Sequence, residues 1–205
     1  NRGHTGERAP EPPVTIVVPV YNEETVILAA LRSLLALRYP VMEIVVVNDG
    51  STDRTLERAV SLEGHYGDTT LRVVSKVNGG KASALNTGIA LARHRFILCM
   101  EGDSRLDPQT LRAAMRHFVD PRVGAVAGNV KVVNRGNVWT RLQALEYVEG
   151  LTMARRAQGF LRVVNIIPGP IGIFRRDVLL QVGAYDTDTF AEDADLTLKV
   201  LTAGW

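Results

Sequence analysis

Residues 191–197, AEDADLT, place three carboxylates within four positions of one another: Glu192, Asp193 and Asp195. Like charges at this spacing repel one another, so a folded chain needs a use for them. Three kinds of site account for such a cluster: a negatively charged helix start, a metal site or a catalytic base. The choice depends on what the rest of the sequence brings to the same place.

A second pair of acids stands in EGD, residues 101–103, directly after an apolar run. Side chains two positions apart in a strand point to the same side, so Glu101 and Asp103 can share a divalent cation. Carboxylate oxygens suit Mg²⁺ or Mn²⁺, and such an ion can also hold a diphosphate. A polar strand end followed by a turn is the alternative. The four histidines are scattered, so no zinc site is indicated.

Tyr21, Glu23 and Asp49 follow two other apolar runs. An aromatic face can stack on a base, and a carboxylate can accept hydrogen bonds from a ribose or a pyrimidine N–H. The alternatives are an Asx turn at Asp49 and a favourable charge in a first helical turn at Glu23. Their joint occurrence at neighbouring strand ends favours a nucleotide site.

Lys81 closes the sequence NGGK, which invites comparison with a phosphate loop. The Walker pattern fails, because Ser75 and Ala82 stand where Gly and Ser or Thr are required. A lysine at a helix start can still meet a phosphate, since a helix N-terminus is electropositive. Taken alone, Lys81 is better interpreted as a solvated side chain.

The elements that must position these residues alternate along the chain. Apolar, β-branched runs predict buried strands, and amphipathic runs between them predict helices, one of which follows residue 22 and is closed by Pro40. This pattern indicates an α/β fold with a mostly parallel sheet covered on both faces, whose ligands bind outside the carboxyl ends of the strands. The five predicted strands are residues 14–20, 43–48, 71–76, 95–100 and 123–133.

Composition limits the class of protein. The chain has 205 residues, 46% hydrophobic and 22% charged, which fits one globular domain. A net charge of +2 gives no field for nucleic acid. The single cysteine, Cys99, lies in an apolar run and is interpreted as a core residue in a reducing compartment. Residues 1–13 are interpreted as a linker or an expression remnant, and residues 14–205 as one domain truncated at its C-terminus.

In order and spacing, a set of motifs over residues 14–205 resembles the family 2 glycosyltransferases, and within them the membrane-bound processive polysaccharide synthases. The poly-N-acetylglucosamine synthases look closest, and hyaluronan, chitin-oligosaccharide and cellulose synthases are more distant. The resemblance implies a GT-A type nucleotide-diphospho-sugar transferase fold with a Rossmann-like sheet. The motifs are VVPVYNEE, VVNDGSTD, NGGKASALNTGI, CMEGDSRLD, GAVAGNVKVVN, QALEY, PGPIGIFRRDVL and AEDADLT.

The same resemblance implies a donor site. Tyr21, Glu23 and Asp49 would hold the base and ribose of a UDP-sugar, and Lys81 would meet the nucleotide or its diphosphate. Asp103 would bind Mg²⁺ or Mn²⁺ as the second acid of the family's D-x-D motif. Glu101 stands where the first Asp is usual, which keeps the charge and adds a methylene.

For the acceptor, Asp193 matches the last residue of the family's T-E-D motif, its general base, with Ala191 in place of the Thr. Gly169 and Pro170 would form a loop beside the sugar and acceptor, to which Glu192 also belongs. The helix expected at residues 138–158 packs on the core or contacts the acceptor or membrane interface.

The implied enzyme is an inverting, UDP-sugar-dependent hexosyltransferase that extends a β-linked polysaccharide, with N-acetylglucosamine the expected sugar and glucose next. A Q-x-x-R-W motif and membrane helices are expected beyond Trp205, which would place the domain at the cytoplasmic face of the plasma (inner) membrane within a longer integral membrane protein. The alternatives are a non-processive family 2 transferase, a sugar nucleotidyltransferase and a non-catalytic nucleotide-sugar-binding partner. A nucleotidyltransferase normally has a Gly-rich, Arg-containing loop after its first strand, where this chain has YNEE.

Overall fold

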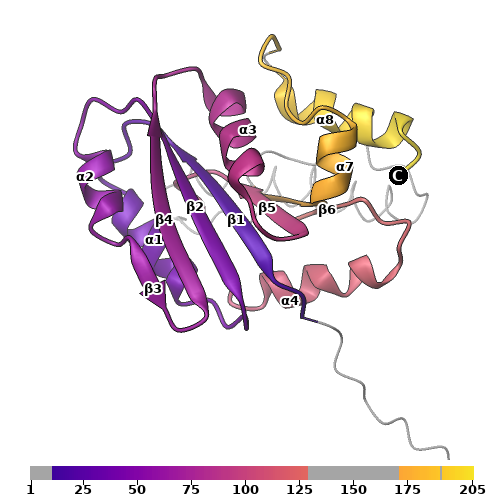
Figure 1. Ribbon diagram of the computed structural model, residues 1–205, viewed down its shortest axis with the longest axis horizontal. Helices are drawn as coiled ribbons and strands as arrows, with labels where there is room; N and C mark the ends of the chain where they lie inside the picture. Colours follow the sequence, from indigo (N-terminus) through magenta and orange to yellow (C-terminus); the bar gives the residue numbers. More distant parts are fainter. Residues whose placement is uncertain (1–10, 129–170, 190) are drawn as a thin grey trace, which may run out of the picture.

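Seven strands of the computed structural model, which describes residues 11–128, 171–189 and 191–205, form one sheet in the order β3-β4-β2-β1-β5-β7-β6 (Figure 1). Its central strands are apolar runs buried on both faces, as the sequence predicts for a covered sheet. The strands are β1 Val14–Val20, β2 Met42–Asp49, β3 Gly64–Tyr66, β4 Thr69–Lys76, β5 Phe96–Met100, β6 Ala125–Ala127 and β7 Ile171–Arg175.

The four central strands, β4, β2, β1 and β5, run parallel, with Val17 of β1 paired to Val45 on one side and to Cys99 on the other. From β1 the chain moves outward to β2 and β4, and then crosses back to β5 on the far side of β1. The carboxyl ends of these strands therefore share one edge. The reversal beside β1 is where α/β sheets bind ligands.

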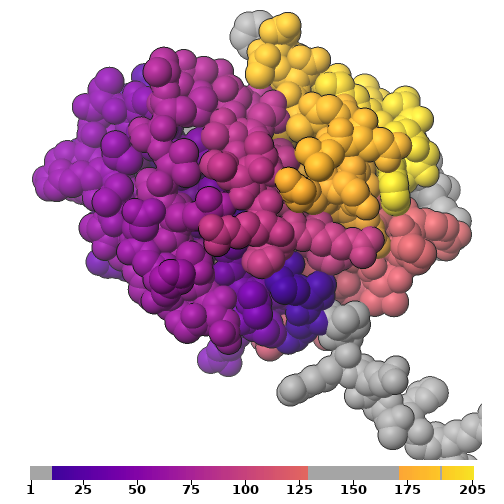
Figure 2. Space-filling model, in the orientation of Figure 1, coloured from indigo at the N-terminus to yellow at the C-terminus, as the bar shows by residue number. Residues whose placement is uncertain are grey.

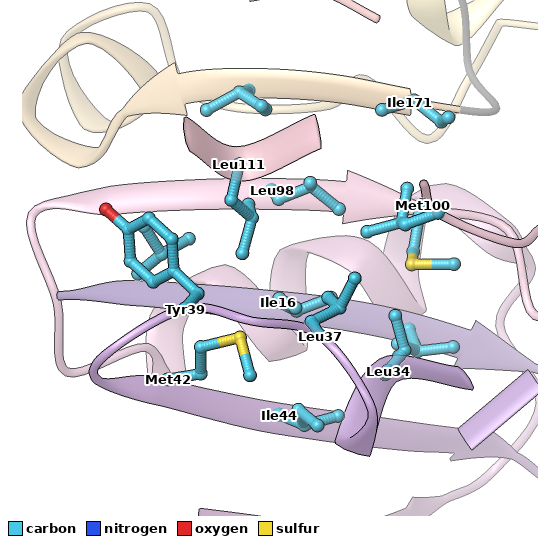
Figure 3. Close-up of a cluster of buried hydrophobic side chains, with 14 of the residues drawn as sticks. Ile16, Leu34, Leu37, Tyr39, Met42, Ile44, Leu98, Met100, Leu111 and Ile171 are labelled. Atoms are coloured by element: carbon cyan, nitrogen blue, oxygen red, sulfur yellow. The ribbon is translucent and has the colours of Figure 1, made fainter. Parts of the chain in front are cut away.

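Helices cover both faces of the sheet (Figure 1). One face carries α1 (Ile27–Leu35), α2 (Thr55–Val60), α4 (Thr110–Met115) and the 3₁₀ turn His117–Val119. The other carries α3 (Lys81–Leu91), α7 (Arg176–Gln181) and α8 (Glu192–Thr202). The core of the first face places Leu34 and Leu111 over the strand residues Ile16, Ile44 and Leu98 (Figure 3).

The sequence prediction of a mostly parallel sheet is confirmed for the four central strands. The strands at both edges of the sheet are antiparallel. β7 was not predicted: it is a short strand containing a glycine, and it lies antiparallel between β5 and β6. β3, also not predicted, is a three-residue antiparallel edge on β4. Of the predicted strand 123–133, residues 125–127 form β6, and residues 129–133 lie outside the described residues, as does the predicted helix 138–158.

The first helix is shorter than its pattern predicts. It begins at Ile27, because Glu23 and Glu24 belong to the loop after β1 and hydrogen-bond across to the next loop. It ends at Leu35, and the buried Leu37 and Tyr39 continue the core in a non-helical segment before Pro40.

Gly88 sets how closely α3 approaches the sheet. A Cβ atom at this position would lie 2.2 Å from Cγ1 of Val17. Only a residue without a side chain therefore allows the observed contact between the helix and β1. This contact fixes the height at which Lys81, at the start of α3, stands over the strand ends.

Gly88→Ala should lower the free energy of unfolding by about 1–2 kcal/mol, because overpacking outweighs the better helix propensity of alanine. Urea denaturation of the variant measures the change. In the double variant with Val17→Ala the two substitutions should partly offset one another, since the new methyl group then has room. Additive losses from the two changes would show that the contact is not limiting.

Candidate functional site

One cavity of about 430 Å³ opens at the carboxyl edge of the parallel strands. The six residues predicted for the donor and metal site all line it, contributed by the ends of β1, β2 and β5 and the start of α3: Tyr21, Glu23, Asp49, Lys81, Glu101 and Asp103. The structure thus brings these six side chains together outside the carboxyl ends of the strands, where an α/β sheet is expected to bind ligands. Asn78, Gly80 and Gly102 also line the cavity, and sequence reasoning gave them no role.

The loop after β1 is fastened to the loop after β2 by reciprocal hydrogen bonds. Asn22 has a left-handed backbone (φ 52°), and its Oδ1 accepts from the backbone N–H of Thr52 at 2.8 Å. Its own N–H donates to Oγ of Ser51 at 3.0 Å. The next N–H, of Glu23, donates to Oγ1 of Thr55 at 2.7 Å. These bonds hold Glu23 at the cavity wall, and turn-forming polar residues after both strands are the signal that could have indicated them.

Tyr21 stands next to this fastened turn with half of its surface exposed (50%). It lines the cavity and packs into neither described core cluster. An exposed aromatic ring on a rigid turn offers a stacking face for a planar ligand.

Asp49 organises the loop that follows β4. Its carboxylate, almost fully buried, accepts from Nζ of Lys76 at 2.7 Å and from the backbone N–H groups of Gly79 and Gly80 at 3.0 and 2.8 Å. The predicted alternative was a turn local to Asp49. Its carboxylate instead bonds to the backbone of a loop about thirty residues further along the chain. The Gly79 N–H also lies 3.2 Å from the other carboxylate oxygen, so the roughly four acceptor positions of Asp49 are taken up within the protein.

Glu23 reaches across the cavity floor to the loop after β5. A Cβ atom on Gly102 would lie 2.1 Å from Oε2 of Glu23, so the carboxyl group rests directly on that glycine. This oxygen is buried, and no hydrogen-bond donor among the described residues reaches it. Burial is the main cause that raises the pKa of Glu23 to about 7, and the charges of Asp103 and Glu101 add to it.

These carboxylates fit a divalent cation that arrives with a diphosphate. Glu101 and Asp103 flank Gly102 at the cavity, and the unsatisfied oxygen of Glu23 lies beside them. Mg²⁺ usually takes one or two carboxylates together with phosphate oxygens and water. Within the described residues, no group of three or more His, Cys, Asp or Glu side chains is arranged as a ready-made metal cage.

Lys81 joins the loop after β5 to the start of α8. Its Nζ lies 2.9 Å from Glu101, 3.0 Å from Glu192 and 3.8 Å from Asp193. Burial lowers the pKa of Lys81, but the hydrogen bond to Glu101 and the charge of Asp193 outweigh it, so that the pKa is raised overall. The interpretation of Lys81 as a solvated lysine is therefore wrong, because the side chain is an ion-pair centre.

The three crowded acids of AEDADLT are separated by their partners. All three lie in the first turn of α8, as a negatively charged helix start predicts. Asp195 pairs with Lys199 one turn along, at 2.8 Å. Glu192 and Asp193 turn instead toward Lys81, which lines the cavity, although neither acid is itself a lining residue. Gly169 and Pro170, the predicted acceptor loop, lie outside the described residues.

Comparison with known proteins yields one family. A model described as "Glycosyl transferase family 2" matches residues 15–183. Poly-beta-1,6-N-acetyl-D-glucosamine synthase of Staphylococcus aureus is 32% identical over 94% of this chain and 46% of its own length. The protein of the same name from Staphylococcus epidermidis is 31% identical over 91% and 45%. The chain thus spans about half the length of these curated relatives.

The solved structures that resemble the chain include two glycosyltransferase complexes. A mannosyltransferase from Pyrobaculum calidifontis in complex with GDP-Man and Mn²⁺ gives a TM-score of 0.75 at 28% identity, over 97% of this chain and 55% of that one. TarS of Staphylococcus aureus in complex with UDP-GlcNAc gives 0.66 at 24% identity, over 92% and 53%. These similarities confirm the predicted GT-A type α/β fold. Among the described residues, no helix is both long and apolar enough to cross a bilayer.

Glu23 should make stability depend on pH. Its folded-state pKa of about 7 lies above the unfolded value of 4.5, so its favourable contribution is complete at low pH and is lost as pH rises through 7. Glu23→Gln should therefore gain about 1 kcal/mol relative to wild type between pH 5 and 8, a value reduced for solvent screening at this partly buried position. Urea unfolding at both pH values, without divalent cations, measures it.

Glu57→Gln is the matched control. Glu57 is an exposed glutamate whose pKa is lowered by a hydrogen bond from Arg54, so it stays ionised across this range. Its substitution should leave the pH dependence unchanged. Equal pH dependence in wild type and Glu23→Gln would contradict a raised pKa at Glu23.

Proposed function

The chain belongs to glycosyl transferase family 2, and we propose that it transfers N-acetylglucosamine from a UDP-sugar to a growing β-linked polysaccharide, with inversion at the anomeric carbon. The observation that carries the proposal is a single contact. Lys81, which lines the donor cavity, also pairs with Asp193 of α8 at 3.8 Å. A donor in the cavity would thus lie beside a carboxylate able to act as a base.

The choice of sugar follows the relatives. Two relatives at 31–32% identity are named as synthases of poly-N-acetylglucosamine. TarS, which shares the fold, is solved with UDP-GlcNAc, so this fold accommodates a donor of that class. The Pyrobaculum mannosyltransferase was solved with GDP-Man, so GDP-mannose is the donor against which a UDP-sugar should be compared. UDP-glucose is the second candidate donor.

Donor binding uses the three strand ends nearest the cavity. The exposed ring of Tyr21 would stack on the uracil, and Asp49 would hold the loop of Gly79 and Gly80 beside the base and ribose. The diphosphate would lie at the start of α3, where Lys81 and the helix N-terminus both carry positive charge. The carboxyl group of Glu23 lies against Gly102, next to the two candidate metal acids.

Asp103 and Glu101 would hold the divalent cation together with the diphosphate. When bound, such an ion stabilises the negative charge that develops on the leaving UDP. The longer side chain of Glu101 is already held by Lys81 at 2.9 Å, so part of the positive charge beside the leaving group comes from the protein itself.

Asp193 would serve as the general base. The acceptor hydroxyl oxygen forms a bond to the anomeric carbon and gives its proton to the Asp193 carboxylate. The bond from that carbon to the β-phosphate oxygen breaks on the opposite face, and its electron pair leaves with UDP. One displacement therefore converts an α-linked donor into a β-linked product, without a covalent intermediate on the protein.

The acceptor, processivity and location of the complete protein are part of this proposal. The relatives are about twice as long as the chain. Resemblance to the processive synthases suggests a location at the cytoplasmic face of the plasma (inner) membrane, with contact through segments outside these residues. A non-processive family 2 transferase is the runner-up. Family membership removes support from a nucleotidyltransferase and from a non-catalytic partner.

Asp193→Asn should slow transfer strongly and keep donor binding. General-base catalysis typically contributes about 10²–10⁴-fold, so the rate of transfer should fall by that factor. The affinity for UDP should stay within about threefold, because the base contributes to the transition state more than to donor binding. Sugar transfer by the complete protein and UDP calorimetry measure the two quantities.

Asp195→Asn is the control for this experiment. It removes a carboxylate from the same helical turn, whose partner is Lys199 and not Lys81. Transfer should remain within about threefold of wild type, because surface ion pairs contribute little. Unchanged transfer in Asp193→Asn, or equal losses in both variants, would contradict the role of Asp193.

A further inference from the structure

The side chain of Asn86 joins helix α3 by hydrogen bonds to the segment that leads to α8. Its Oδ1 accepts from the backbone N–H of Tyr185 at 3.0 Å, and its Nδ2 donates to the carbonyl of the same residue at 2.8 Å. The amide thus satisfies both backbone groups of one residue 99 positions away. In Figure 2 the magenta surface around α3 adjoins the orange and yellow C-terminal segment.

Tyr185 is the first residue after a constrained turn at the end of α7. Gly183 and Ala184 both have left-handed backbones, at φ 81° and 57°, and the latter is unusual for a residue with a side chain. The Ala184 N–H donates to the carbonyl of Leu179 at 2.8 Å, which closes the turn. The chain therefore leaves α7 in a defined direction, and Asn86 holds it at its first step.

The side chain of Tyr185 anchors the same point to the sheet. It is 4% exposed and packs with Leu85 of α3 and Leu196 of α8. Cys99, on the strand that ends just before the candidate metal acids, belongs to the same buried cluster. Tyr185 thus lies in one buried cluster with residues of α3, α8 and β5, which carry or lead to the donor lysine, the base and the metal acids.

We propose that Asn86 is a positioning residue for the base: by holding the backbone of Tyr185 it fixes the approach to α8, and so the start of that helix, against α3. This inference rests on the proposed function, in which Asp193 accepts the acceptor proton. The distance from Lys81 to Asp193, 3.8 Å, is set by this arrangement. Donor contacts at Tyr21 and Asp49 lie on other elements and do not depend on it.

Two properties make Asn86 suited to this role. Helix α3, which carries Asn86, is fixed on the sheet because Gly88 packs directly onto Val17 of β1. If the hydrogen bonds to Tyr185 are lost, α3 therefore cannot move to restore them. Only a side-chain amide of this length presents a donor and an acceptor side by side. Aspartate would keep the acceptor for the N–H and would set a second oxygen against the Tyr185 carbonyl.

The test compares Asn86→Ala and Asn86→Asp with two controls in the complete protein. Thr87→Val removes a hydroxyl from the next position of the same helix, where it bonds only to the carbonyl of Ser83. Ile44→Val is a core substitution in β2, remote from Tyr185, that lowers stability to a comparable extent. Sugar transfer from UDP-N-acetylglucosamine, UDP affinity by calorimetry and thermal unfolding are measured for each.

Both Asn86 variants should lower kcat by about 10–100-fold, since a misplacement near 1 Å can cost about 10²-fold. Their UDP affinity and KM for the donor should change by less than threefold, and both controls should keep the kcat of wild type. Unchanged kcat in the Asn86 variants overturns the proposal. So does a loss of UDP affinity that parallels the loss of kcat, because Asn86 would then support the whole fold.

The two hypotheses fail separately in this experiment. If wild type transfers no sugar from any UDP donor, the proposed function fails, and the role of Asn86 fails with it. If wild type transfers sugar and the Asn86 variants transfer equally well, the proposed function stands and only the role of Asn86 is overturned.

Discussion

Repulsion among carboxylates at one edge of the sheet is the constraint on which the rest of the site depends. At a separation of 4 Å, two like charges near a protein surface cost about 4 kcal/mol. Lys81 neutralises the group at the α8 end by contacting Glu101, Glu192 and Asp193, while Lys76 and two backbone N–H groups hold Asp49. Within the described part of the chain, no salt bridge reaches Glu23 or Asp103. A cation that arrives with a diphosphate would relieve the charge that remains there.

The fold places these groups by a few close contacts. Parallel strands bring four loop starts to one edge, and the crossing back from β4 to β5 opens the crevice beside β1. Two glycines then set the depth of that crevice: Gly88 brings α3 against β1, and Gly102 leaves room for the carboxyl group of Glu23. Beyond them, Asn86 ties α8 to the same helix that carries Lys81. Donor and base sides of the site therefore meet along α3.

Sequence alone could predict the central strands and the cavity residues, because buried β-branched runs that end in polar residues are typical of a covered parallel sheet with a ligand site at its edge. It could not predict β7, a glycine-containing strand that joins the sheet from far along the chain. Nor could it assign Asn86, whose partner lies 99 residues away, or recognise Lys81 as an ion-pair centre. Such contacts depend on tertiary packing between distant elements, whereas spacing within the sequence reports only local periodicity. The hydrogen bonds between the loops after β1 and β2 could be predicted in part. Both loops contain turn-forming residues in the sequence, but their pairing is seen only in the structure.

The family and the GT-A type fold are shown by comparison with known proteins. The central claim of the proposed function is that the donor is UDP-N-acetylglucosamine. Its most direct measurement is nucleotide release by the complete protein from UDP-N-acetylglucosamine, UDP-glucose and GDP-mannose, each with Mn²⁺ and with a chelator. We predict that release is fastest from UDP-N-acetylglucosamine and falls when the cation is chelated. Faster release from GDP-mannose, or no release from any of the three donors, would contradict the proposed donor.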